Sequence, residues 1–179
     1  MFPNLSRPLK GYLLMACVIV LVFCFWAWQD AQQIRKCLIN ERQRDLYKIA
    51  TSLEQRFSGS YELLLTGGEQ GLTAAEKGTI LNARLQPVLR EISAEWPEYG
   101  MGFYFNEFCI LAAIPDNPEL RGKTAPKEAL EVYAKKQTVI TYVDTALTKA
   151  GKEALSINYP LFWQGEIIGH IWAVVKVED

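Results

Sequence analysis

The sequence is poor in the residues that usually build catalytic and metal centres. It has a single histidine, His170, and only four cysteines among 179 residues. It contains no HExxH motif, no CxxC pair and no glycine-rich phosphate loop. We therefore expect no enzyme activity, no catalytic residue, no metal site and no cofactor in this chain.

The cysteines are too few and too scattered to form a disulfide framework. Cys17 and Cys24 lie in an apolar run, where cysteine acts as a small apolar residue. Cys37 and Cys109 lie outside that run, but their spacing resembles neither a disulfide scaffold nor a zinc site. The redox state of Cys37 and Cys109 stays open at this stage.

The chain also lacks an excess of basic residues. It has 19 Lys and Arg against 20 Asp and Glu, and a formal net charge of −1. Two of the basic residues, Arg7 and Lys10, precede the apolar run, which leaves about −3 on the rest of the chain. Nucleic-acid binding needs a concentrated basic surface, so nucleic acid is excluded as a partner.

Charge is absent from one long stretch, Gly11 to Trp28, read as GYLLMACVIVLVFCFWAW. About 18 helical residues span about 27 Å, enough to cross a bilayer core. A cleaved signal peptide is the main alternative, but the bulky Phe25–Trp28 segment offers no small-x-small cleavage site. A buried core helix is the other alternative. The run favours an uncleaved transmembrane helix over residues 11–28.

The charges that flank this run predict its orientation. Arg7 and Lys10 come before it, and the first acidic residue, Asp30, comes just after it. Cytoplasmic flanks are enriched in Lys and Arg, so residues 1–10 should be cytoplasmic. We therefore expect a single-pass protein of the inner (cytoplasmic) membrane with its C-terminal domain outside the cytoplasm.

A second helix is predicted from Gln29 to about Leu65, where the only Gly is Gly59 and there is no Pro. Its apolar residues recur at spacings of mostly three, four or eight: Ile34, Leu38, Leu46, Ile49, Leu53, Phe57, Tyr61 and Leu64. One apolar stripe means one buried face. The stripe either packs on its own domain or forms the seam of a homodimer through helix 29–65, and the sequence leaves both open.

A helical hairpin is predicted over residues 29–97. Gly67 and Gly68 stop the first helix, and Thr73 with Glu76 has the spacing of a capping box that opens another. Pro87 lies inside the second helical pattern, where we expect a kink or a restart because proline removes a backbone donor.

Beyond residue 98 the apolar period changes to two, which is typical of strands. The predicted strands are Met101–Asn106, Cys109–Ile114, Val139–Asp144, Ala154–Phe162 and Glu166–Val177, with one helix at Pro126–Lys136. The expected fold class is α+β, in which a transmembrane helix and a helical hairpin precede a five-stranded antiparallel sheet over residues 98–179.

Two local sequences carry a family resemblance. One is Leu120-Arg121-Gly122-Lys123; the other is Tyr159-Pro160-Leu161 followed by Gly165-Glu166-Ile167-Ile168-Gly169. With the order of elements, they resemble the Cache-type (PAS-like) extracytoplasmic sensor domains of bacterial histidine kinases and chemoreceptors. The resemblance implies a ligand-binding sensor domain for signal transduction, as in two-component systems. Its motifs specify turns and do not specify a ligand.

Receptors of this kind carry a second membrane helix and cytoplasmic output modules after the sensor. No residue pattern here indicates a kinase, so we expect a sensor domain that lacks its output module, whether as a fragment of a longer receptor or by itself. The alternative is a structural membrane component of a pilus or secretion assembly. The chain lacks the Gly-Phe-Thr-x-x-Glu start of type IV pilins.

The candidate binding residues are polar-tipped groups on the predicted strands: Tyr104, Tyr142, Ser156, Asn158, His170 and Trp172. A concave apolar wall with a few polar groups is the ordinary design of a small-molecule site. The resemblance implies a small organic acid as ligand, with Arg121 and Lys123 near the pocket mouth as carboxylate partners. Plain packing or solvation is the alternative for each residue. His170 in particular could be packed, exposed, ligand-contacting or pH-sensing.

Overall fold

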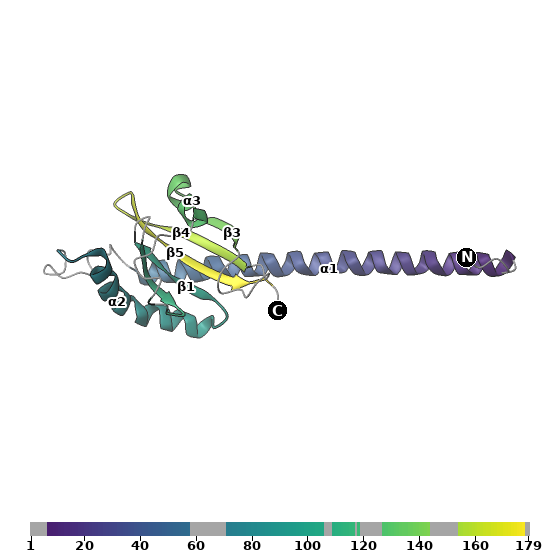
Figure 1. Cartoon of the computed structure of the whole chain (residues 1–179), viewed down its shortest axis with the longest axis horizontal. Coiled ribbons are helices and arrows are strands. Elements are labelled where there is room, and N and C mark those ends of the chain that lie inside the picture. The colour runs from purple at the N-terminus through teal and green to yellow at the C-terminus, as the bar shows by residue number, and fades with distance from the viewer. Residues whose placement is uncertain are drawn as a thin grey trace. The chain divides into compact units, whose positions relative to one another are not determined.

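The computed structural model describes residues 7–57, 71–105, 109–116, 118, 127–143 and 154–177. The chain divides into two compact units, Met1–Asn40 and Glu41–Asp179. Helix α1, Arg7–Arg56, contributes to both units, and every described strand belongs to the second (Figure 1). The candidate site residues that the structure describes therefore all lie in one compact unit.

Helix α1 joins the two predicted N-terminal helices into one. Its sequence has no proline after Pro8, which lies in the first turn, where proline is tolerated. The helix ends at Arg56, before the predicted end near Leu65, and residues 58–70 lie outside the described part of the chain.

The apolar stripe of α1 is buried only in the second unit. Leu46, Ile49 and Leu53 are 0% exposed, whereas Ile34 in the first unit is 69% exposed. The predicted stripe thus packs on its own domain from Leu46 to Phe57. Its earlier residues are exposed in this single chain, and Tyr61 and Leu64 lie outside the described residues.

Helix α2, Ala74–Glu95, begins with the predicted capping box. The Thr73 N–H donates to Glu76 Oε2 at 2.9 Å, and the Glu76 N–H donates to Thr73 Oγ1 at 3.4 Å. The helix continues through Pro87 without the restart that we considered. Four apolar side chains on one face are buried on both sides of the proline, and this packing offsets one missing hydrogen bond. They are Leu81, Leu85, Leu89 and Ile92.

The five strands form one antiparallel sheet in the order β2-β1-β5-β4-β3, which confirms the predicted fold class. They are β1 Gly100–Phe105, β2 Cys109–Ile114, β3 Val139–Val143, β4 Ala154–Trp163 and β5 Glu166–Lys176, with helix α3 at Lys127–Lys135. The β4–β5 turn has Gln164 and Gly165 at φ of 51° and 87°. Gly165 supplies the backbone conformation that this tight turn requires.

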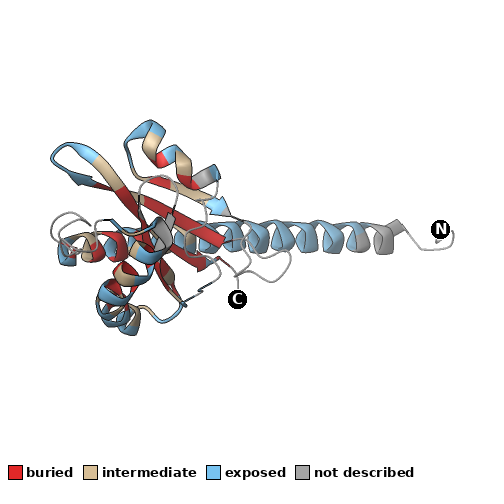
Figure 2. Ribbon diagram, turned by 60° about the vertical axis from the view of Figure 1, so that its left-hand side comes forward, coloured by how far each residue is buried: buried red, intermediate tan, exposed pale blue. Residues whose placement is uncertain are grey.

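Helices cover both faces of this sheet (Figure 2). On one face, which we call the α1 face, the Phe57 and Phe103 rings are 5.6 Å apart, and the Tyr159 hydroxyl donates to Glu54 Oε2 at 2.8 Å. On the other, the α3 face, Ala129 packs against Tyr104. Because both faces are covered, the sheet residues are mostly buried, and their ribbon is red in Figure 2.

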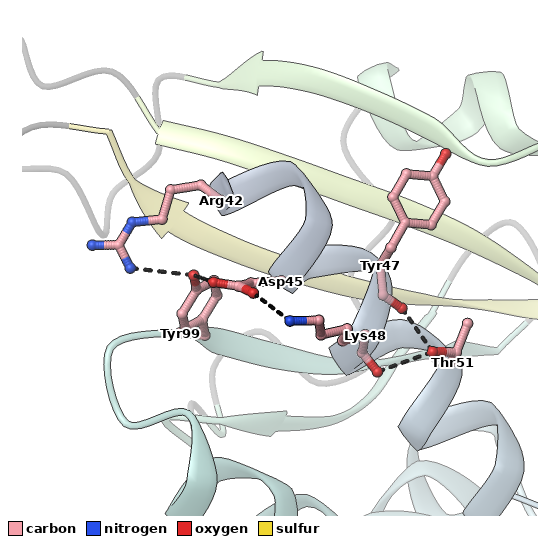
Figure 3. Close-up of polar contacts among 6 residues, drawn as sticks. All are labelled: Arg42, Asp45, Tyr47, Lys48, Thr51 and Tyr99. Atoms are coloured by element: carbon pink, nitrogen blue, oxygen red, sulfur yellow. Dashed lines mark hydrogen bonds and ion pairs between the residues drawn. The ribbon is translucent and has the colours of Figure 1, made fainter. Parts of the chain in front are cut away.

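A polar network fixes α1 to the residue that precedes β1 (Figure 3). Tyr99 is 5% exposed, and its hydroxyl accepts from Arg42 Nη1 at 3.2 Å and donates to Asp45 Oδ2 at 3.3 Å. Lys48 Nζ in turn donates to Asp45 Oδ1 at 3.2 Å. Burial is the main reason that the pKa of Tyr99 is raised, so the hydroxyl keeps its proton and can donate at neutral pH.

We expect Tyr99→Phe to lower the free energy of unfolding by about 1–2 kcal/mol, because it removes the buried hydroxyl that bonds both Arg42 and Asp45 and leaves them only their exposed partners, Glu98 and Lys48. The same change at Tyr142, which is 52% exposed, should alter it by less than about 0.5 kcal/mol. Denaturation of the full chain in detergent, followed by circular dichroism, compares the two variants. Equal stabilities would show that the network does not stabilise the fold.

Candidate functional site

The strand registers place the polar residues of the sheet on the α3 face. Tyr104 of β1 pairs with His170 of β5, and Asn158 of β4 pairs with Trp172 of β5. Ser156 pairs with Thr141 of β3. Paired residues of antiparallel strands share a face, as do residues two apart. Among the residues that the registers place on this face are Gly102, Tyr104, Val139, Thr141, Ser156, Asn158, Pro160, His170, Trp172 and Val174.

His170 lies at the centre of the aromatic part of this face. Its side chain is 0% exposed, and its imidazole stacks on the Tyr104 ring with centroids 4.4 Å apart and planes 10° apart. The Tyr133 ring of α3 meets the imidazole edge-on, and its hydroxyl is 2.8 Å from His170 Nδ1. Burial lowers the pKa of His170 to about 3. The imidazole is therefore neutral at physiological pH.

One nitrogen of this imidazole has no partner. His170 Nε2 is buried and makes no hydrogen bond in the described part of the chain. Trp172 Nε1, two residues along the same face of β5, is also buried and makes no hydrogen bond among the described residues. A buried polar group without a partner costs about 1–3 kcal/mol, so two of them on one face are unusual in a native domain.

The Trp172 indole lies close against the backbone of β1. A Cβ built on Gly102 would lie 2.7 Å from Trp172 Nε1, and it would also collide with the carbonyl oxygen of Ala112. Only glycine fits at this position, because a glycine in a strand allows a neighbour to approach the backbone. Leu130 of α3 and Trp172 pack against the cluster of Tyr104 and Ala129.

The remaining polar groups of this face are also buried. Asn158 and Ser156 are 4% and 8% exposed. Thr141 Oγ1 is buried and has no hydrogen-bond partner among the described residues. Burial raises the pKa of Tyr104 to about 12, so its phenol stays protonated. The face therefore offers neutral, polar-tipped side chains within an apolar wall, an arrangement suited to binding a small molecule.

Five of the predicted site residues share this face: Tyr104, Ser156, Asn158, His170 and Trp172. Tyr142 does not. It pairs with Leu155, which alternates with Ser156, so it lies on the α1 face and is 52% exposed. Its neighbour Thr141 lies on the α3 face instead, at the place where we expected Tyr142. Arg121 and Lys123 lie outside the described residues.

Sequence reasoning missed three residues of this face and its cover. Tyr133 is absent from the predicted site, yet its hydroxyl reaches His170. Gly102 lies in the interior of a strand, where a glycine indicates that another group approaches the backbone closely. Thr141 is next to Tyr142 in the same strand, so strand alternation alone predicts that the two side chains lie on different faces of the sheet.

The architecture is that of a Cache-like sensor fold. Two solved structures of the Campylobacter jejuni chemoreceptor Tlp3 share it. The ligand-binding domain in complex with 4-methylisoleucine has a TM-score of 0.56 and 14% identity, covering 80% of this chain and 55% of that one. The sensory domain with isoleucine bound has a TM-score of 0.52 and 11% identity, covering 97% and 64%. The chain therefore has the fold of these chemoreceptor ligand-binding and sensory domains.

Within this class the chain belongs to the AtoS N-terminal domain family, which matches residues 9–179. The signal transduction histidine-protein kinase AtoS of Escherichia coli (strain K12) is 23% identical to it over 149 residues, 81% of this chain. The chain spans 23% of the length of that kinase. The family is named for the N-terminal domain of that kinase.

Burial of His170 predicts acid sensitivity. Its folded-state pKa, about 3, lies below its ordinary value of 6.5, so between these pH values only the unfolded chain binds the proton. Stability should fall as the pH drops from 6.5 toward 3, by up to about 1.4 kcal/mol per pH unit from this residue. Urea unfolding at pH 6.5 and 4.5 measures the slope.

His170→Gln is the control, because the chain has no other histidine and the carboxylates contribute equally to both proteins. The wild-type stability should fall more steeply with acid than that of the variant. Equal slopes would mean that His170 takes up its proton in the folded state as readily as in the unfolded state.

Proposed function

We propose that this chain is a membrane-anchored extracytoplasmic sensor domain that binds a small molecule on the α3 face of its sheet and transmits that signal to an output module. The observation that carries the proposal is the pair of buried, unpartnered nitrogens, His170 Nε2 and Trp172 Nε1. A ligand with hydrogen-bonding groups would satisfy both, which explains why the fold retains them.

The comparisons favour a small metabolite as that ligand. The Tlp3 structures hold 4-methylisoleucine and isoleucine, which are amino acids with one carboxylate and an apolar body. The α3 face has the matching character, since buried polar tips stand among Val139, Val174 and the aromatic rings. An organic acid or amino acid is therefore the ligand class that we propose. The relation to AtoS favours a histidine kinase as the class of output.

The membrane anchor is proposed for residues 11–28 of α1. Among the described residues, α1 is the one helix long and apolar enough to cross a membrane, and the apolar window of this helix is not buried by the rest of the chain. Exposed residues such as Phe23, Leu21 and Trp26 would be costly in water and favourable in lipid. Arg7 and Lys10, which precede the apolar run, favour a cytoplasmic N-terminus.

Ligand binding should stabilise the full chain in detergent. A carboxylate at about 100 times its dissociation constant should add about 2.7 kcal/mol, raising the melting temperature by a few degrees. Asn158→Leu should abolish this gain, because it removes a polar group from the α3 face at nearly constant volume. Tyr142→Phe, on the α1 face, should retain it.

Thermal denaturation against a panel of organic acids and amino acids makes this comparison. No shift with any compound would contradict the binding function. A ligand that stabilises Asn158→Leu as strongly as the wild type would mean that its site lies elsewhere than the α3 face.

The orientation can be tested with Cys37, which is exposed and free. In a variant that retains only this cysteine, a membrane-impermeant maleimide should label intact spheroplasts, because residues after Trp28 lie outside the cytoplasm. A variant that retains only Cys17, within the apolar run, should stay unlabelled. Labelling of Cys37 only after lysis would show that the orientation is opposite to the one proposed.

Mild oxidation of the first variant tests the homodimer that the sequence left open, since a parallel seam along helix 29–65 should bring two copies of Cys37 together.

A further inference from the structure

Three contacts hold the His170 imidazole in one orientation. Tyr104 stacks on its face at 4.4 Å, the Tyr133 ring meets it edge-on at 5.5 Å, and the Tyr133 hydroxyl lies 2.8 Å from Nδ1. The direction of Nε2 is therefore fixed by packing. What Nε2 offers to a ligand depends on whether it carries the proton of the neutral ring.

The bond between Tyr133 and Nδ1 decides where that proton lies. A phenol is a stronger hydrogen-bond donor than a neutral imidazole N–H, and its oxygen is a weak acceptor because its lone pair is delocalised into the ring. An unprotonated imidazole nitrogen is, in contrast, a strong acceptor. The favoured arrangement at 2.8 Å is thus Tyr133 O–H donating to Nδ1, which puts the ring proton on Nε2.

We propose that Tyr133 is a positioning residue that fixes His170 in its Nε2–H form, so that the α3 face presents two neutral N–H donors, His170 Nε2 and Trp172 Nε1, to an oxygen acceptor of the ligand. The acceptor is a carboxylate or carbonyl group. The ligand part of this proposal depends on the proposed function, but the proton position does not.

The geometry of β5 supports shared recognition by these donors. His170 and Trp172 are two residues apart on one face of a strand, so their Cα atoms are about 7 Å apart. Both nitrogens are buried, and neither has a partner among the described residues. A ligand that presents only amine donors here would leave both N–H groups unsatisfied, and such mismatches are rejected strongly.

The groups that surround His170 on the described elements are consistent with a neutral ring. Tyr104 on β1 and Tyr133 on α3 are the titratable side chains in contact with it, and its β4 partner is Pro160. The α3 charges Glu131 and Lys135 pair with each other at 2.6 Å and are exposed. No described carboxylate contacts the imidazole to stabilise its charged form.

The single histidine makes the proton position measurable. With histidine labelled by nitrogen-15 in the full chain in detergent at pH 7, a long-range proton–nitrogen spectrum reports one imidazole. We expect the pattern of a protonated Nε2 and an unprotonated Nδ1. Tyr133→Phe, which keeps the ring and removes the hydroxyl, should shift this pattern toward a mixture of both forms, and Tyr142→Phe should leave it unchanged. A wild-type ring protonated at Nδ1, or at both nitrogens, would overturn the proposal even if the variant failed to fold.

Ligand class is tested with short carboxylates of two to six carbons, each matched with the amine of the same carbon skeleton. The carboxylates should stabilise the wild type and the amines should not, and Tyr133→Phe should bind the stabilising carboxylate about tenfold more weakly or worse. Stabilisation by amines alone would overturn the acceptor assignment. If a carboxylate binds while the His170 ring carries its proton on Nδ1, the proposed function holds and the inference about Tyr133 is wrong. An Nε2–H ring with no carboxylate or carbonyl compound bound would refute the ligand part alone.

Discussion

The alternation of side chains along β1, β4 and β5 is the constraint on which the rest of the structure depends. Because these strands pair in register, each row across the sheet belongs wholly to one face. The row of Phe103, Ile171 and Tyr159 meets α1, whereas the row of Tyr104, His170 and Pro160 meets α3. A shift of one residue in either pairing would turn polar side chains of the shifted strand toward α1 and its apolar side chains toward α3. The register thus separates a face that holds the fold together from a face that carries unsatisfied polar groups.

Local rules account for most of the predicted fold. The strands alternate clearly and are bounded by turn residues, so each predicted strand end agrees with the structure to within one residue. The capping box at Thr73 and Glu76 is a local hydrogen-bond pattern, and it formed as expected. Pro87 was harder to predict, because tertiary burial of its neighbours decides whether a helix continues past a proline. The extent of burial along α1 likewise depends on how far the sheet reaches, which no local pattern specifies.

The candidate site was predicted less completely, for a related reason. Residue chemistry singled out His170, Trp172, Asn158, Ser156 and Tyr104, and strand pairing brings them onto one face. Tyr142 was grouped with them because it is polar, without regard to the alternation of side chains along β3. That alternation places Thr141, and not Tyr142, on the α3 face. Tyr133 could not be predicted as a partner of His170, since the two residues are 37 positions apart and meet only when α3 docks on the sheet. Long-range packing, not composition, decides which polar groups meet.

Strand β1 links the two polar centres of the second unit. Tyr99, immediately before β1, is held by Arg42 and Asp45 of α1, and Tyr104, within β1, stacks on His170. Five residues of extended chain separate them, about 17 Å. The β1–β5 pairing is unbroken over Gly100–Phe105, whereas the β1–β2 pairing shifts register between Phe103 and Tyr104. A change in the His170 stack can therefore be taken up by the pairing of β1 with its neighbours, where this irregularity lies, or by the hydrogen bonds of Tyr99. The ladder involves many hydrogen bonds that act together, whereas Tyr99 holds α1 through two bonds longer than 3 Å, so the weaker connection lies at α1.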